Sequence, residues 1–311
     1  MVYIMLFAGF VFLIKGADFF VEGSSSIAKR FQVPVIIIGM TIVAMGTSLP
    51  EAAVSISAAL SGNNELAIAN AVGSNVFNLM VVAGTCSLFT PLTVHAKTLK
   101  KEFPFSVAAA VLLLILGSTG LYLSRWEGLI LLIVFTGFII WMIRSAKKAK
   151  EIVVLADEEE FQILPGAKSA IYIAGGAAAI AIGGQFVVSS ASSIARSFGL
   201  SQNLIGLTIV ALGTSLPELV TSIVAARKGE VDMAMGNIIG SNIFNILFVI
   251  GSAGTISGIV FSRDNIIDIT ILIFMSFVVW IVAWTQYKIY RYEGILMLLL
   301  YAGFMTYIIL R

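Results

Sequence analysis

The stretch "TIVAMGTSLPE" occupies residues 41–51, and "TIVALGTSLPE" occupies residues 208–218. Both copies lie in very apolar surroundings, yet both end in a proline and a carboxylate. Proline lacks the backbone N–H and crowds the carbonyl four residues earlier, so it bends or breaks a helix. The fold must therefore accommodate two broken, charged segments inside its most hydrophobic regions.

The composition of the chain indicates that these surroundings are a lipid bilayer. Of 311 residues, 59% are hydrophobic and 12% are charged, whereas soluble domains carry about 25% charged residues. The apolar runs reach the roughly 20 residues that a helix needs to cross about 30 Å of hydrocarbon. They do not alternate with period two, so helices are favoured over a β-barrel. We predict an all-α polytopic protein of the cell membrane.

About ten apolar segments are candidate transmembrane helices. They are 1–21, 33–60, 66–89, 103–123, 127–143, 169–190, 202–226, 232–257, 266–285 and 294–310. The strongly polar stretch 144–168 contains RSAKKAK and DEEE and is typical of a solvated linker. The predicted organisation is a first half at 1–143, a linker at 144–168 and a second half at 169–311.

The two halves are copies of each other. A shift of 167 residues places 35–79 on 202–246 with about half of the positions identical, including GSNVFN (73–78) on GSNIFN (240–245). Each half has about five spans, an odd number, so the two copies enter the membrane from opposite sides. This is the inverted-repeat plan of secondary transporters, with broken helices in spans 2 and 7.

Lysine and arginine in the loops predict the orientation, because they concentrate on the cytoplasmic side. The loops after odd-numbered spans contain Lys29, Arg30, Lys97, Lys100, Lys101, Arg144, Lys147, Lys148, Lys150, Lys168, Arg227, Lys228, Lys288 and Arg291. The opposite side contains Arg125, Arg196, Arg263 and Arg311. We therefore expect both termini outside and the 144–168 linker in the cytoplasm.

The prolines also predict which backbone carbonyls lack a helical hydrogen-bond donor. Pro50 leaves the Gly46 carbonyl without its helical donor, and Gly46 makes the distortion easier to adopt; Pro217 and Gly213 repeat this arrangement. Irregular backbone at membrane depth survives only where it is buried in protein or lines a cavity. Carbonyls freed in this way are hard oxygen ligands that suit Na⁺ or Ca²⁺.

Oxygen-bearing side chains follow the same faces of these helices, since residues three or four apart are neighbours. In the first half they are Thr47, Ser48 and Glu51, followed by Asn70, Ser74 and Asn78 with Asn75 flanking. In the second half they are Thr214, Ser215, Glu218, Asn237, Ser241, Asn242 and Asn245. With two carboxylates and neither thiolate nor imidazole, the set predicts a hard cation rather than zinc, copper or iron.

Each element also has a structural interpretation. Small and amide side chains commonly serve close helix packing and interhelical hydrogen bonds, and Gly73, Gly240, Asn75 and Asn242 fit that role. What packing does not readily explain is the recurrence of all these elements at one fixed shift. Three further charges, Lys15, Asp18 and Glu22, have no counterparts in the second half, and we interpret them as end-of-helix charges that snorkel or pair.

GTSLPE followed by GSNxxN, in two inverted copies, resembles the α-repeats of the sodium/calcium exchanger family over the whole chain. The resemblance implies a set of ion ligands in which the two alanines contribute backbone carbonyls. The set is Ala44, Thr47, Ser48, Glu51, Ser74, Asn78, Ala211, Thr214, Ser215, Glu218, Ser241 and Asn245. It also implies that Ca²⁺ and Na⁺ share Glu51 and Glu218 in turn, and that the first and sixth helices slide against the rest.

The expected function is electrogenic exchange of Na⁺ for Ca²⁺, with H⁺ competing at the carboxylates. Asn245, where some relatives carry Asp, puts K⁺ cotransport in doubt. A Ca²⁺/H⁺ antiporter of the same superfamily and a passive cation channel remain alternatives. No enzyme motif, cofactor or nucleic-acid partner is expected. The chain is compatible with a monomer.

Overall fold

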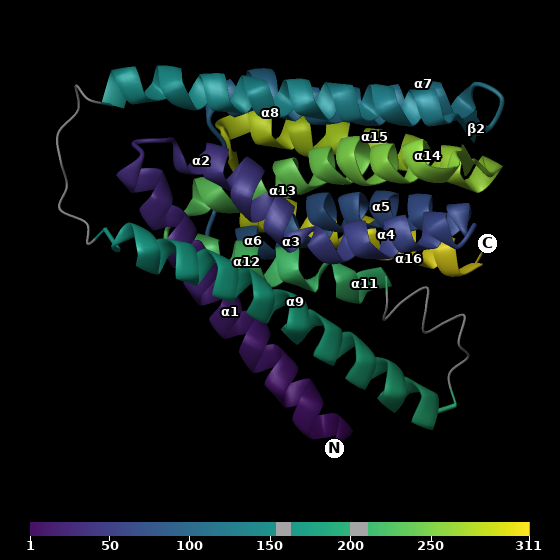
Figure 1. Cartoon of the computed structure of the whole chain (residues 1–311), viewed down its shortest axis with the longest axis horizontal. Coiled ribbons are helices and arrows are strands. Elements are labelled where there is room, and N and C mark those ends of the chain that lie inside the picture. Colours follow the sequence, from purple (N-terminus) through teal and green to yellow (C-terminus); the bar gives the residue numbers. More distant parts are fainter. Residues whose placement is uncertain (154–162, 200–210, 311) are drawn as a thin grey trace.

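The computed structural model describes residues 1–153, 163–199 and 211–310, which are mostly helical (Figure 1). The first half comprises α1 (Val2–Arg30), α2 (Val35–Ile38), η1 (Gly39–Val43), α3 (Ala44–Thr47), α4 (Leu49–Leu60), α5 (Asn64–Phe77), η2 (Asn78–Val82), α6 (Ala83–Phe89), β1 (Leu92–Thr93), η3 (Thr98–Glu102), α7 (Phe103–Ser118), β2 (Tyr122–Leu123) and α8 (Arg125–Val153). The second half comprises α9 (Gly166–Ser197), α11 (Ala211–Thr214), α12 (Leu216–Arg227), α13 (Val231–Ile243), η5 (Phe244–Ile250), α14 (Gly251–Ser257), β3 (Ile259–Val260), α15 (Arg263–Gln286), β4 (Lys288–Ile289) and α16 (Arg291–Leu310). The segments labelled η are π-helical turns.

The prediction of a helical membrane protein is confirmed in this coarse form. Among the described residues, seven helices are long and apolar enough to cross a membrane, and a bent pair formed by Val35–Thr47 and Leu49–Leu60 makes an eighth. The span expected at 103–123 is the shorter helix α7, with 16 residues. The span expected at 202–226 lies partly outside the described residues, which resume at 211.

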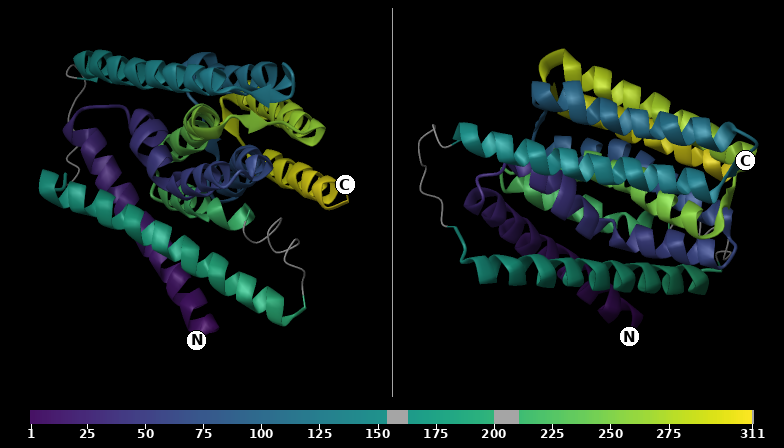
Figure 2. Two further views of the ribbon diagram at one scale, coloured as in Figure 1. Left: turned by 45° about the vertical axis from the view of Figure 1, so that its right-hand side comes forward. Right: turned by 45° about the horizontal axis from the view of Figure 1, so that its top comes forward.

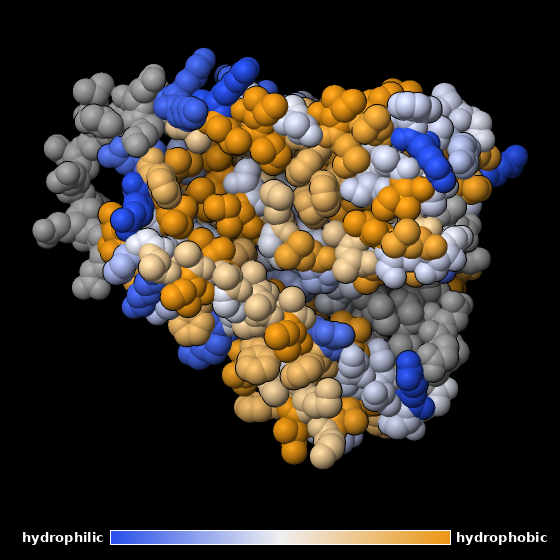
Figure 3. Space-filling model, in the orientation of Figure 1, coloured by the Kyte–Doolittle hydropathy of each residue, from blue (hydrophilic) through white to orange (hydrophobic). Residues whose placement is uncertain are grey.

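The outer surface is apolar, as lipid contact requires. Figure 3 shows hydrophobic side chains over much of the visible face, while strongly hydrophilic ones gather mainly toward its ends. Large hydrophobic side chains such as Phe7, Phe274 and Leu299 are 62–72% exposed. Exposure on this scale would favour association in water, so it fits a bilayer.

Two continuous helices form the centre of the molecule. They are α5–η2–α6 and α13–η5–α14, whose apolar windows are 78% and 94% buried. α3, α4 and α12 lie beside them, with α7, α8 and α15 on one side and α1 and α9 on the other (Figures 1 and 2). The helices that contain the two GSNxxN motifs are thus the most enclosed.

The long helices α1 and α9 pack against each other along a seam of small residues. A Cβ added at Gly9 would lie 2.9 Å from the Gly183 carbonyl oxygen, and one at Gly176 would lie 2.8 Å from the Gly16 carbonyl oxygen. The residue numbers of the contacting pairs rise along α1 and fall along α9, so the two helices run antiparallel. Small residues let membrane helices approach this closely.

Short strands connect the two halves at both ends of another helix pair. β1 pairs antiparallel with β4, and β2 pairs antiparallel with β3. β1 and β2 flank α7 in the chain, and β4 and β3 flank α15. Since α7 also packs against α15, these two helices are held together at both ends.

Helix boundaries differ from the predicted spans wherever polar residues continue a helix. The first span, expected at 1–21, continues to Arg30 in α1. Lys15, Asp18 and Glu22 therefore lie inside that helix, so the expectation that they mark a helix end is wrong. The expectation of pairing holds for Asp18 and Glu22, which both lie within ion-pair distance of Lys228. Residues 144–153 of the predicted linker belong to α8, and 166–168 belong to α9. The linker stretch 154–162 lies outside the described residues.

Candidate cation site

Both GTSLPE motifs interrupt a helix between the threonine and the leucine. α3 ends at Thr47, Ser48 has φ −85° and ψ 9°, and α4 starts at Leu49 with its axis turned by 50°. Pro50 lies in the first turn of α4, where the missing N–H has no helical partner in any case. The second copy is likewise interrupted at Ser215, between α11 and α12.

The motif glycines provide space for the outer helices. A Cβ added at Gly46 would lie 2.7 Å from the ring of Phe20 in α1, and one at Gly213 would lie 2.1 Å from Cγ2 of Val188 in α9. Gly46 lies inside α3 and Gly213 inside α11. Their small size therefore allows close helix contact, a role in addition to the flexibility expected from the sequence.

The carboxylates lie in the first turns of α4 and α12 and are fully buried. Each accepts a hydrogen bond from the break serine of the other half. Ser215 Oγ donates to Glu51 Oε1 at 3.0 Å, and Ser48 Oγ donates to Glu218 Oε1 at 2.7 Å. Residues far apart in the sequence thus form one polar centre.

Serines of the central helices extend this centre. Ser74 Oγ in α5 lies 3.3 Å from Glu51 Oε1 and 2.9 Å from Ser215 Oγ, within hydrogen-bond distance of both. Ser241 Oγ in α13 lies 3.5 Å from the carbonyl oxygen of Ala44. Ala211 starts α11 at the position equivalent to Ala44.

One asparagine in each half links the bent helix to the central helix beside it. Asn70 Nδ2 donates to the Glu51 carbonyl at 3.2 Å and to Ser55 Oγ at 2.9 Å. Asn237 Nδ2 lies 3.5 Å from the Glu218 carbonyl and 2.9 Å from Ser222 Oγ. Sequence reasoning did not single out Ser55 and Ser222, although they recur at the same 167-residue shift.

The motif threonines complete these links by crossing between the halves. Thr47 Oγ1 donates to Asn237 Oδ1 at 3.1 Å, and Thr214 Oγ1 donates to Asn70 Oδ1 at 3.4 Å. Each asparagine therefore donates within its own half and accepts from the other. The side chains of the two GTSLPE motifs and the two central helices form one connected network.

The middle asparagines of the GSNxxN motifs connect the central helices directly. Asn75 Nδ2 donates to the Asn242 carbonyl at 3.1 Å, and Asn242 Nδ2 donates to the Asn75 carbonyl at 3.3 Å. The same two side chains accept from Asn245 and Asn78, respectively. These contacts agree with the packing role considered for Asn75 and Asn242.

Four buried oxygens at this centre have no hydrogen-bond partner among the residues that the structure describes. They are Glu51 Oε2, Glu218 Oε2, Asn78 Oδ1 and Asn245 Oδ1, all on side chains with no exposed surface. A buried oxygen without a partner is unfavourable by about 1–3 kcal/mol, and more if it is charged. Carboxylate and amide oxygens are the ligands that hard cations prefer. The arrangement can therefore hold an oxygen-seeking cation.

Comparison with known proteins places this geometry in a family. A profile described as "Sodium/calcium exchanger protein" matches residues 1–144 and 168–310. The chain belongs to the sodium/calcium exchanger family. It is thus a multi-pass membrane transporter of the cation/Ca²⁺ antiporter kind and not an enzyme, as the sequence resemblance predicted.

Individual known proteins are similar to this chain over most of its length. Inner membrane protein YrbG of Escherichia coli is 36% identical, with 89% of this chain and 88% of YrbG aligned. Sodium/calcium exchanger MaX1 of Methanosarcina acetivorans is 30% identical, with 98% and 97% aligned. The solved structure of the exchanger NCX_Mj soaked with zero Na⁺ and Ca²⁺ superposes with a TM-score of 0.84 at 29% identity, covering 97% of this chain and 96% of that one.

Proposed function

We propose that the chain exchanges Na⁺ for Ca²⁺ across the membrane by alternating access, through the buried centre between its two halves. The observation that carries this proposal is the set of four unpartnered buried oxygens, two of them on carboxylates. A divalent cation neutralises both carboxylates and occupies oxygens that would otherwise remain unsatisfied. The names of related exchangers, which specify sodium and calcium, support the choice of ions.

The proposed ligands are the residues implied by the family resemblance. They are Ala44, Thr47, Ser48, Glu51, Ser74, Asn78, Ala211, Thr214, Ser215, Glu218, Ser241 and Asn245. The hydrogen bonds among these side chains support one shared site. Both halves of that site come from the same chain, which supports a monomer as the transporting unit.

The proposed architecture is ten transmembrane helices in two inverted five-helix repeats. The helix breaks at Ser48 and Ser215 and the equivalent hydrogen bonds of the two halves support it. The separate profile matches at 1–144 and 168–310 support the division into 1–143, 144–168 and 169–311. The lysine and arginine distribution supports outer termini and a cytoplasmic linker.

The charge of the site makes the exchange electrogenic. Two carboxylates with one Ca²⁺ are neutral, whereas the same site with more than two Na⁺ carries net positive charge. Inward movement of Na⁺ then drives Ca²⁺ out and moves charge inward. The membrane potential acts on this charge with about 2.3 kcal/mol per elementary charge per 100 mV. A negative interior therefore assists Ca²⁺ extrusion.

Uptake of ⁴⁵Ca²⁺ into proteoliposomes preloaded with Na⁺ tests this proposal. We expect uptake that requires the outward Na⁺ gradient, is altered by an imposed membrane potential and is abolished in Glu51→Gln. Glu127→Gln is the matched control, because Glu127 caps the start of α8 by accepting from Ser124. H⁺ should compete with Ca²⁺ at the carboxylates and slow the exchange at low pH.

Two other outcomes identify the alternatives. Uptake driven only by an outward H⁺ gradient would make the protein a Ca²⁺/H⁺ antiporter that uses the same carboxylates. Uptake that ignores every gradient and simply follows the Ca²⁺ concentration would make it a passive channel. Either result would refute Na⁺/Ca²⁺ exchange.

A further inference from the structure

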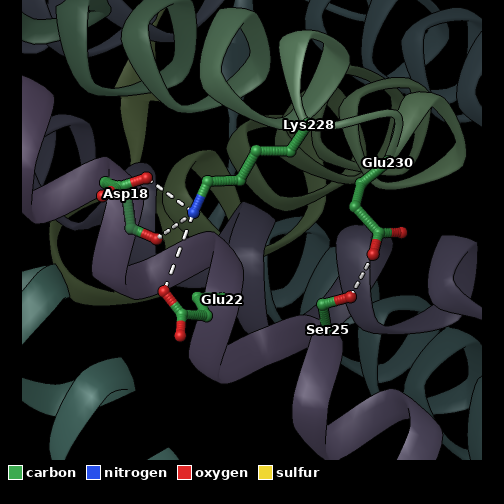
Figure 4. Close-up of polar contacts among 5 residues, drawn as sticks. All are labelled: Asp18, Glu22, Ser25, Lys228 and Glu230. Carbon is green, nitrogen blue, oxygen red and sulfur yellow. Dashed lines mark hydrogen bonds and ion pairs between the residues drawn. The ribbon is translucent and has the colours of Figure 1, made fainter. Parts of the chain in front are cut away.

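A group of charged side chains ties α1 to the turn between α12 and α13 (Figure 4). Lys228 Nζ lies 2.5 Å from Asp18 Oδ1 and 3.8 Å from Glu22 Oε2. The same ammonium also donates to the Asp18 carbonyl at 3.2 Å. One lysine thus contacts two successive turns of α1.

A second pair of contacts continues along the same helix. Ser25 Oγ donates to Glu230 Oε1, and Lys29 Nζ lies 3.6 Å from that oxygen. The four α1 positions 18, 22, 25 and 29 are separated by four, three and four residues, so they share one face. We call Asp18, Glu22, Ser25, Lys29, Lys228 and Glu230 the ion-pair cluster.

The turn held by this cluster connects two helices of the cation site. Lys228 directly follows α12, which contains Glu218 in its first turn, and Glu230 is the N-cap of α13, which contains Ser241. The positive-inside rule places this turn on the cytoplasmic side. The ion-pair cluster therefore fixes α1 to the cytoplasmic edge of the site.

The cluster is not repeated at the four equivalent positions that would supply most of its charges, all of which the structure describes. At the 167-residue shift, Asp18 and Glu22 correspond to Gln185 and Ser189, while Lys228 corresponds to Ser61. Glu230 corresponds to Asn63. Ser61 and Asn63 bond within their own segment, to the Ser57 carbonyl and the Leu66 amide. The charges of the ion-pair cluster thus break the symmetry of the repeats.

We propose that the ion-pair cluster is a one-sided lock that stabilises the state in which the cytoplasmic access to the site is closed. In an exactly symmetric pair of repeats the two access states would be equivalent, so charges that are replaced at the equivalent positions make the two states unequal. α1 and α9 move together because of their close seam, and the lock determines which state of this pair predominates. This inference rests on the proposed exchange function.

The expected strength is modest because the ion pairs are partly exposed. The side chains of Lys228, Asp18 and Glu22 are 34–44% exposed, and such pairs are weak and screened by salt. Loss of the network should therefore shift the ratio of the two states by about threefold to tenfold. A shift of that size is measurable from the two sides of the membrane.

The test compares Lys228→Met with wild type in everted and right-side-out membrane vesicles, with Na⁺-dependent ⁴⁵Ca²⁺ flux as the readout. A larger population of the cytoplasm-open state lowers the apparent KM for Ca²⁺ at the cytoplasmic face and does not lower it at the outer face. Lys228→Arg should behave as wild type. Lys147→Met in α8 is the control for removal of a cytoplasmic lysine.

Salt offers a separate test on the wild-type protein. Raising choline chloride at the cytoplasmic face from about 0.1 M to about 0.5 M should reproduce part of the effect of Lys228→Met.

Equal changes at both faces, or none, would refute the lock, since a change in intrinsic affinity or folding does not distinguish the two sides. A second readout does not depend on transport. Ala28 in α1 is fully buried, and we expect Ala28→Cys to react faster with a membrane-impermeant maleimide at the cytoplasmic face when Lys228→Met is added. Absence of Na⁺-dependent flux in wild type would refute the proposed function, whereas an unchanged labelling rate would refute the lock.

Discussion

At the scale of single residues, the crosswise bonds are the defining feature of the site. Ser48 donates a hydrogen bond to Glu218, and Ser215 donates one to Glu51, so neither carboxylate is positioned by its own half alone. A serine hydroxyl stabilises a carboxylate as a donor and can turn its lone pairs toward a cation. The two serines therefore occupy equivalent positions and make the same bond to the glutamate of the other half.

Replacing either serine should weaken ion binding to a similar degree. Hydrogen bonds to charged groups contribute about 1.5–3 kcal/mol, so Ser48→Ala and Ser215→Ala should each raise the apparent KM for Ca²⁺ roughly tenfold to a hundredfold. The measurement is ⁴⁵Ca²⁺ exchange in proteoliposomes. Ser61→Ala, which removes a hydroxyl bonded only to the Ser57 carbonyl, should change little. A large loss in one variant with none in the other would contradict the equivalence.

The sequence predicted most of this centre because the motif occurs twice at one offset. The structure brings Ser48, Ser215, Ser74 and both glutamates into contact, although their role as ion ligands stays a prediction. The crosswise partners were not predictable, because they depend on how the two halves dock. Ser55 and Ser222 were missed because an isolated serine in a membrane helix resembles ordinary packing.

At the scale of helices, the first glycine of the second GSNxxN motif serves close packing. A Cβ added at Gly240 would lie 2.6 Å from both Cα and O of Met40. The contact is this close because α13 packs directly on η1 and α2. The motif alone does not predict this contact, because it depends on how the two halves dock.

This contact predicts the effect of a substitution. Gly240→Ala forces backbone apart and should cost about 1–3 kcal/mol of stability. Gly303→Ala, at an exposed position of α16 where a Cβ would meet no described atom within 4 Å, should stay within about 0.5 kcal/mol of wild type. Thermal unfolding in detergent measures both variants. Similar midpoints for the two variants would show that the close contact of α13 with η1 relaxes without cost.

Helix ends were predicted less well than helix cores. Hydroxyl and small residues after the first apolar run continue α1 to Arg30, where Ser25 donates to Glu230 and Ser26 accepts from the Leu164 amide. The charged residues at 144–153 likewise extend α8. Hydropathy locates the part of a helix that lies in lipid, whereas the helix ends are determined by packing and solvent contacts beyond it.

At the scale of the whole molecule, each half lacks groups that the other supplies. The first half contains Glu51 without Ser215, and β1 without β4. The coarse fold, a polytopic helical protein built from a repeated sequence, followed from composition and motif. The number of spans and their inversion remain proposals, because part of the predicted seventh span lies outside the described residues.

Separate expression of the halves tests this dependence. We expect 1–153 and 163–311 to accumulate poorly alone, because each exposes an unsatisfied carboxylate and unpaired strand edges. Co-expression should restore a complex that co-purifies and exchanges Ca²⁺. As a control, Glu51→Gln in the first fragment should still permit association while abolishing exchange. Stable accumulation of a single half would refute the mutual dependence.

The strand pairs have a consequence for how the protein is made. β2 can pair only after β3, at 259–260, has been synthesised, and β1 only after β4, at 288–289. Both partner strands belong to the second half of the chain. During synthesis, therefore, a fully inserted first half stands in the membrane with strand edges that can pair with the wrong chain. The risk of wrong strand pairing is therefore greatest after the first half has left the ribosome and before the second half has followed. Its yield should depend on how quickly the second half follows the first.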